Sequence, residues 1–271
     1  ASYAAKQKDG PHAQLLDISK KAIKQAHAIL SFVPEDEEGL RSIVRDGSRL
    51  YRLDPFIEFT AFTKAKDRKV ELREIISAKY DIDTRLPWLL TVAMMRNGDK
   101  FNSYSLLGQS LKLLKNEQWQ LIVVGDGIAY EPVKLMLNKV SENQIFLIGQ
   151  KPQDTLPEIY AASDLLVWPA VNEAYGMTFL EAAASGLPVI AGDNRGVSQI
   201  VENNITGKLI KPWHHTKFAD AVLQLIHDPK KRAAMGEAAQ QRVQSKHSIN
   251  RAAEIISKAL IDSVNRSSRE V

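Results

Sequence analysis

Two glutamates on either side of a helix start are the first candidates for chemistry in this sequence. Glu173 and Glu181 stand eight positions apart in VNEAYGMTFLEAAASGLPVIA, residues 171–191. An ionised carboxylate accepts two or more hydrogen bonds, which suits the vicinal hydroxyls of a sugar. A glutamate near a helix start also favours the helix dipole, so the spacing alone is equally consistent with a structural role. If both carboxylates face one ligand, they fit a molecule with a sugar at each end.

The residues between the two glutamates suit an anion. The backbone N–H groups of Tyr175, Gly176, Met177 and Thr178 are expected at the amino end of a helix, where they have no partner within the helix. Together with the helix dipole, such groups favour a phosphate. Gly176 permits the unusual φ or the close approach that a bound anion requires.

A basic pair forms the second group of candidates. Arg96 and Lys100 lie four positions apart around a glycine in MMRNGDK. The planar fork of an arginine and the compact charge of a lysine suit a diphosphate leaving group. A solvated loop is the simpler explanation of the pair, but this loop leaves the same edge of the expected sheet as the glutamate segment.

Two further loops contain glycine directly after an apolar run. Gly125 and Gly127 in VVGDGIAYEP lack the third glycine of the dinucleotide fingerprint, which disfavours a dehydrogenase. We interpret Gly125 as part of a tight turn close to a ligand. Gly149 to Lys151 could border a base, and an ordinary turn explains these residues equally well.

Six short apolar runs must position these loops. They occupy residues 87–95, 120–125, 144–149, 164–169, 187–192 and 207–212, with helical patterns such as YSLLGQSLKLL between them. Strands that are apolar on both faces are typical of a parallel sheet covered by helices. The pattern therefore predicts a doubly wound α/β domain with a Rossmann-like parallel sheet, whose carboxyl edge binds ligands.

Three domains or parts of domains are expected along the chain. Residues 1–57 predict two helices and two strands, too few to cover an open sheet, and we interpret them as a remnant of a second α/β domain. Residues 58–246 form the ligand-binding domain, beginning with a linker at 58–69. Residues 247–271 predict an amphipathic C-terminal helix. The first residue is not Met, and we expect the chain to be part of a longer protein.

Composition excludes several classes of protein. The 271 residues include no cysteine, so a disulfide framework and a thiolate metal site are excluded. No apolar run is long enough to span a membrane, and no basic block interleaved with aromatics predicts a nucleic-acid partner. His214 and His215 are adjacent, point in different directions and lack a carboxylate at ligand spacing, so we expect no metal. A net charge of +4 leaves an acidic membrane surface open as a partner, and a cytoplasmic location is expected.

Several stretches together carry a family resemblance. In order and spacing, the chain resembles the donor-binding half of retaining glycosyltransferases of the GT-B type, family four, over roughly residues 80–245. The segments are LPWLLTVAMMRNGDK, LIVVGDG, IFLIGQ and LPEIYAASDLLVWPAVNEAYGMTFLEAAASGLPVIAGDNRGVSQIVENNITGKLIKP. The resemblance implies a GT-B C-terminal domain, a C-terminal helix that crosses toward the N-terminal domain, and an acceptor-binding N-terminal domain that is largely absent from this chain.

The resemblance also implies roles for the candidate residues. Arg96 and Lys100 would stabilise the departing nucleoside diphosphate, Glu173 would contact the transferred sugar, and Glu181 would hold the ribose hydroxyls. The backbone from Ala174 to Thr178 would lie against the phosphates and the sugar. Members of this type usually need no metal or other cofactor, because basic residues and a helix N-terminus supply the positive charge.

The expected function is transfer of a hexose from a nucleotide diphosphate sugar to a glycan or lipid-linked acceptor, with the donor site on this chain. Two other readings remain open. One is another GT-B enzyme, such as a sugar epimerase or a phosphorylase. The other is a non-catalytic module for nucleotide-sugar binding or assembly, in which the site is vestigial.

Overall fold

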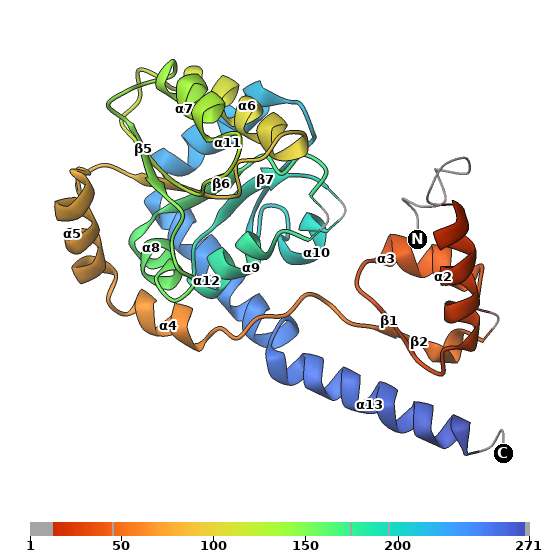
Figure 1. Ribbon diagram of the computed structural model, residues 1–271. Coiled ribbons are helices and arrows are strands. Elements are labelled where there is room, and N and C mark those ends of the chain that lie inside the picture. Colours follow the sequence, from red (N-terminus) through yellow and green to blue (C-terminus); the bar gives the residue numbers. More distant parts are fainter. Residues whose placement is uncertain (1–12, 45, 174, 195, 269–271) are drawn as a thin grey trace. The chain divides into compact units, whose positions relative to one another are not determined.

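Six of the apolar runs form one parallel sheet, as predicted. The computed structural model describes residues 13–268 except positions 45, 174 and 195 (Figure 1). The strands of this sheet are β3 (Trp88–Val92), β4 (Gln120–Val124), β5 (Ile145–Gly149), β6 (Leu165–Trp168), β7 (Val189–Gly192) and β8 (Gly207–Ile210). Their order is β5-β4-β3-β6-β7-β8, and every neighbouring pair is parallel. The predicted doubly wound α/β fold is therefore confirmed.

Helices cover both faces of the sheet. One face carries α6 (Asp99–Lys112), α7 (Tyr130–Asn138) and α11 (His215–His227), and the other carries α8 (Leu156–Ala162), α9 (Met177–Ala184) and α12 (Pro229–Lys246) (Figure 1). The short helix α10 (Val197–Ile200) precedes β8. Because the sheet lies between two layers, its strands are buried on both sides, and Leu89, Leu90 and Val167 are fully inaccessible.

The prediction of a linker at residues 58–69 is wrong. Helix α4 (Thr60–Lys66) occupies most of this segment, and α5 (Lys69–Tyr80) follows directly. Phe62 and Ala65 of α4 are buried. The ring of Phe62 meets the ring of Tyr160 edge-on, with the ring centroids 6.0 Å apart. The segment is too short to show a helical period clearly, so it becomes helical through tertiary packing.

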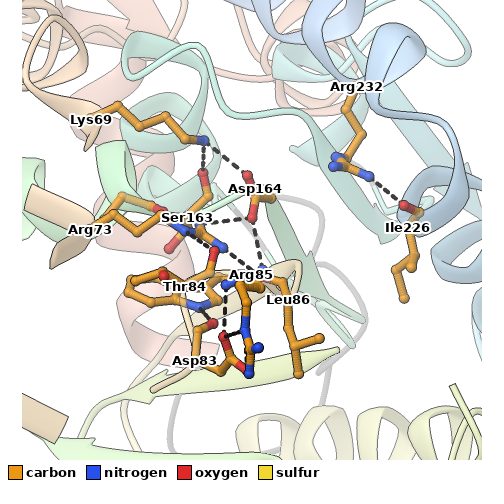
Figure 2. Close-up of polar contacts among 12 residues, drawn as sticks. Lys69, Arg73, Asp83, Thr84, Arg85, Leu86, Ser163, Asp164, Ile226 and Arg232 are labelled. Atoms are coloured by element: carbon orange, nitrogen blue, oxygen red, sulfur yellow. Dashed lines mark hydrogen bonds and ion pairs between the residues drawn. The ribbon is translucent and has the colours of Figure 1, made fainter. Parts of the chain in front are cut away.

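A carboxylate that is only 16% exposed ties α5 to two strands at the amino edge of the sheet. Asp164 precedes β6 and accepts hydrogen bonds from Lys69 Nζ at 3.0 Å, Arg73 Nη1 at 2.9 Å and the backbone N–H of Trp88 at 2.9 Å (Figure 2). The Arg73 guanidinium also lies 4.1 Å from the centroid of the Trp88 ring. This cluster is structural, because it lies at the edge of the sheet opposite the loops that carry the candidate site residues.

The chain divides into two units, residues 57–245 and residues 1–56 with 246–271. The second unit contains α2 (Ala13–Gln25), β1 (Ile29–Ser31), α3 (Pro34–Arg41), the 3₁₀ helix η1 (Gly47–Arg49), β2 (Leu50–Arg52) and α13 (Ile249–Ser267). Strands β1 and β2 are parallel. Helix α13 contacts β2 through Tyr51, whose hydroxyl donates to Asp262 Oδ2 at 2.7 Å, and Arg266 donates to the His27 carbonyl at 2.8 Å. Among the described residues, no helix is both long and apolar enough to cross a membrane.

Candidate functional site

The strand order creates a crevice between β3 and β6. The chain continues from β3 through α6 to β4 on one side, and from β6 through α9 to β7 on the other side. Because the two segments diverge, a gap opens at the carboxyl ends of these strands, where doubly wound folds bind ligands. Lys100 of α6 and Glu173 after β6 come from the two sides of this crevice. Lys100 Nζ donates to Glu173 Oε2, and the two side chains are 17% and 16% exposed.

Two hydrogen bonds fix the backbone that carries Glu173. The N–H of Val171 donates to Ser103 Oγ at 2.9 Å, and Asn172 Nδ2 donates to Asp99 Oδ1 at 3.1 Å. Asn172 has a left-handed φ of 51°, which is uncommon outside glycine and is maintained by such contacts. The loop after β6 is therefore tied to the first two turns of α6, which orients Glu173 toward Lys100.

Helix α9 begins beside this ion pair. Its N-cap residue Gly176 has a φ of 70°, and a Cβ at this position would lie 2.3 Å from the Phe179 ring. No other residue fits there without displacing Phe179. Met177 and Thr178 are the first two helical residues, so their N–H groups have no partner within the helix. These amides and the helix dipole make the start of α9 suitable for an anion.

A single cavity of about 750 Å³ contains the ion pair and the start of α9. Its walls come from the carboxyl ends of β3, β4, β5 and β6, from the first half of α9 and from the first residues of α6 and α8. The lining residues are Val92, Ala93, Met94, Lys100, Val124, Gly125, Asp126, Gly127, Ile128, Gln150, Lys151, Leu156, Glu173, Gly176, Met177, Thr178 and Glu181. Two lysines and three carboxylates therefore share one cavity with apolar side chains and helix amides, an arrangement that suits a polar ligand with an anionic group and a ring system.

Glu181 lines the cavity one turn into α9, and a hydrogen bond from the buried Tyr160 holds its carboxylate. The hydroxyl of Tyr160 donates to Glu181 Oε2 at 2.7 Å and lies 2.7 Å from Thr178 Oγ1. Burial raises the pKa of the Glu181 carboxyl, and the hydrogen bond from Tyr160 acts against that rise. Burial also raises the pKa of Tyr160 well above its usual value, so the phenol stays protonated and remains a donor.

Backbone hydrogen bonds join the carboxyl ends of β3, β4 and β5 beside the cavity. The N–H of Gly125 donates to the Gly149 carbonyl at 3.1 Å, and the N–H of Ala93 donates to the Val124 carbonyl at 3.0 Å. A Cβ on Gly125 would lie 2.0 Å from the Ala93 carbonyl oxygen. Close approach of neighbouring backbone therefore requires this glycine, and the residue also lines the cavity.

The structure brings most of the sequence candidates together. Lys100, Gly125, Glu173, Gly176, Met177, Thr178 and Glu181 all line the cavity. Arg96 does not: its side chain is exposed and has no ion-pair partner among the described residues. Gly149 and Tyr175 are also outside the set of lining residues, and Ala174 lies outside the described residues.

Sequence reasoning missed Tyr160 and the apolar part of the cavity. Tyr160 is fully buried in α8, and an aromatic residue in a short helical pattern is more often a core residue than a partner of a site residue. Met94 and Ile128 line the cavity and are 62% and 84% exposed. Their only signal in the sequence is their place directly after predicted strands.

The histidines expected not to bind a metal lie at the start of α11. His214 is the N-cap residue and His215 the first helical residue. Within the described part of the chain, no group of three or more His, Cys, Asp or Glu side chains is arranged to hold a metal ion.

Known proteins resemble this chain in sequence and in fold. The family described as "Glycosyl transferases group 1" matches residues 73–242. Alpha-D-kanosaminyltransferase of Streptomyces kanamyceticus is 26% identical over 240 residues, which are 86% of this chain and 60% of that protein. D-inositol 3-phosphate glycosyltransferase of Corynebacterium aurimucosum is 36% identical over 103 residues, which are 38% of this chain and 24% of that protein.

Two solved structures share the fold. A glycosyltransferase from Rickettsia africae has a TM-score of 0.78 at 22% identity, over 89% of this chain and 66% of its own. Anabaena HepE in complex with UDP and glucose has a TM-score of 0.75 at 17% identity, over 90% of this chain and 66% of its own. The chain thus spans 60% to 66% of the kanosaminyltransferase and of these two solved structures. Because the family match covers well over half of the chain and includes every residue that lines the cavity, this chain belongs to the glycosyl transferases group 1 family.

Proposed function

We propose that this chain binds the donor for a retaining glycosyltransferase of family four, which transfers a hexose from a nucleotide diphosphate sugar to a glycan or lipid-linked acceptor. The donor occupies the cavity between Lys100 and Lys151. A second GT-B domain, to which residues 1–57 belong, binds the acceptor and completes the cleft. The enzyme works in the cytoplasm, at or near the inner face of a membrane.

One observation carries the proposal: Lys100, two glutamates and the first residues of α9, whose N–H groups have no partner within the helix, line the same cavity in an order that matches the parts of such a donor. Glu173 and Lys100 lie at the crevice between β3 and β6, the amides of Met177 and Thr178 follow, and Glu181 lies one turn further along. A sugar at Glu173, phosphates at the helix start and a ribose at Glu181 satisfy each of these groups. Gln150 and the residues beside it then border the base.

The names of the relatives support the same class of donor. The solved structure of Anabaena HepE contains UDP and glucose, and a relative from Corynebacterium glutamicum is a GDP-mannose-dependent mannosyltransferase that is 33% identical over 136 residues. By extension to this chain, the base is uracil or guanine and the sugar is a hexose.

The chemistry in this proposal is stabilisation of the leaving group and positioning. As the bond from the sugar to the diphosphate breaks, negative charge grows on the phosphate oxygens, and Lys100 and the amides of α9 face that charge. Arg96 lies in the loop directly before α6 and adds a second cation when its exposed side chain turns toward the phosphates. With these groups in place, no metal ion is needed.

Titration calorimetry of this chain with UDP, GDP, ADP and their glucose and mannose conjugates tests the proposal. One nucleotide family should bind selectively, and Glu181→Ala should weaken that binding by about tenfold or more, because the ribose loses a charged acceptor. Glu202→Ala is a matched control, since Glu202 lies in the same unit, does not line the cavity and pairs with Arg242 at 2.9 Å.

The outcomes separate the competing functions. Binding to none of the nucleotides would support a vestigial module and overturn the proposal. If the conjugate binds but incubation yields a free or phosphorylated sugar or an epimer, another GT-B enzyme is the better description.

A further inference from the structure

Tyr160 does not line the cavity, but its hydroxyl contacts two residues that do. Its side chain is fully buried, and its ring packs edge-on against Phe62 of α4 at a centroid distance of 6.0 Å. Its hydroxyl is shared by two α9 side chains that do line the cavity, Thr178 and Glu181, each at 2.7 Å. The Tyr160 ring is fixed in the core, so its hydroxyl donates to the Glu181 carboxylate from a fixed position.

This contact leaves one side of the carboxylate open. Glu181 Oε2 is occupied by the Tyr160 hydroxyl, whereas Oε1 has no hydrogen-bond partner among the described residues and is not one of the buried unpartnered atoms. A glutamate has three rotatable bonds, so without a fixed partner its free oxygen would sample several positions. With Oε2 held, Oε1 has a defined place in the cavity.

A buried tyrosine hydroxyl needs a partner, and a backbone carbonyl could have served. Tyr104 shows this solution in the same unit, because its hydroxyl donates to the Ala93 carbonyl at 2.8 Å. Donation to a carboxylate is stronger than donation to a neutral carbonyl and favours the ionised form of the acid. The choice of Glu181 as partner therefore affects the cavity as well as the core.

We propose that Tyr160 is a positioning residue: it holds Glu181 so that the free carboxylate oxygen accepts a hydroxyl of the ligand ribose. This inference rests on the proposed function, because it concerns the ribose of a bound nucleotide. It adds a residue outside the cavity wall to those that determine specificity. The consequence is a preference for ribonucleotides over nucleotides without ribose hydroxyls.

The experiment compares two affinities within each variant. UDP, GDP or ADP, whichever binds the unaltered chain most tightly, is titrated beside its 2′,3′-dideoxy counterpart. The unaltered chain should prefer the ribonucleotide, and Tyr160→Phe should reduce that preference by about tenfold, the effect of losing one hydrogen bond to a charged group. A general loss of packing would weaken both affinities and leave their ratio unchanged, so the ratio separates positioning from a structural role.

A matched control exists in the other unit. Tyr51 also donates to a carboxylate, Asp262 Oδ2, at the same 2.7 Å, and Tyr51→Phe should leave the ratio unchanged. In a Glu181→Ala background, Tyr160→Phe should have no further effect on the ratio, because no carboxylate remains to be positioned. This double variant also keeps the test decisive if Tyr160→Phe alone loses stability.

Two results would overturn the inference in distinguishable ways. If the unaltered chain prefers the ribonucleotide and Tyr160→Phe keeps that preference, Tyr160 does not position Glu181 and the proposed function stands. If the unaltered chain binds none of the three nucleotides, the proposed function and this inference fail together.

Discussion

At the scale of single residues, the proposed role of Glu181 in ligand binding conflicts with its contribution to stability. A carboxylate that is ready to accept ligand hydroxyls must stay partly desolvated, and burial raises its pKa. The folded protein therefore binds this proton more tightly than the unfolded chain does. The stability that Glu181 contributes is fully present below the usual glutamate pKa and is lost as the pH rises through the higher value of the folded state.

Replacing Glu181 by glutamine should remove the loss of stability that ionisation of this buried carboxyl causes at neutral pH. We expect the variant to be more stable than the unaltered chain at pH 7, by about 1 kcal/mol, because a neutral amide replaces the desolvated charge while Tyr160 can still donate to it. At pH 4 the difference should shrink. Urea denaturation at both pH values measures the effect, and a gain of the same size at both would contradict the assigned cause.

At the scale of elements, the amino edge of the sheet depends on one carboxylate. Asp164 joins α5 to the starts of β3 and β6 (Figure 2). Burial on its own would raise the pKa of Asp164, but Lys69 and Arg73 outweigh it and the pKa is lowered. The stability from this carboxylate is therefore present above its usual pKa and is lost as the pH falls through the lowered value.

Asp164→Asn should destabilise the protein by about 2 to 4 kcal/mol at pH 7, because it leaves Arg73, whose side chain is 13% exposed, without its charged partner. Chemical denaturation from pH 7 to pH 2 should show the two chains converging in acid. Asp83→Asn is the matched control. Arg85 lowers the pKa of Asp83 to about 2, yet the Arg85 side chain is 86% exposed, so this substitution should cost much less. Equal losses would show that burial is not what gives Asp164 its effect.

At the scale of the whole molecule, the two units differ in how the chain builds them. Residues 57–245 are continuous and contain the complete six-stranded sheet and every residue that lines the cavity. The other unit combines residues 1–56 with residues 246–271. These two segments are separated in the sequence by the whole of the continuous unit. The continuous unit has what an independently folding domain requires.

Residues 57–245 expressed alone should therefore unfold cooperatively and bind the same nucleotide as the full chain, with a Kd within about threefold. Calorimetric titration and thermal unfolding of both proteins, side by side, provide the comparison. Loss of binding by a folded fragment would show that the site needs residues outside this unit.

The sequence by itself determined the sheet, its carboxyl edge and a set of candidate residues, most of which line the cavity. Continuous apolar runs that alternate with helical patterns indicate a parallel sheet buried on both faces, and Gly176 marks the start of α9 because few other residues tolerate its φ of 70°. These are local properties, which neighbouring residues in the sequence largely decide.

Only the tertiary structure decided which side chains meet. Lys100 pairs with Glu173 across 73 positions because β3 and β6 are neighbours, and strand order is not encoded in the periodicity of either strand. The contact of Tyr160 could not be predicted for the same reason. Its hydroxyl reaches Glu181 only because α8 packs beside α9. Arg96, which seemed equivalent to Lys100 in sequence, lies outside the cavity wall because it belongs to the exposed loop before α6, whereas Lys100 lies in the first turn of that helix. Side-chain direction and strand order arise from packing, and packing is a property of the whole chain.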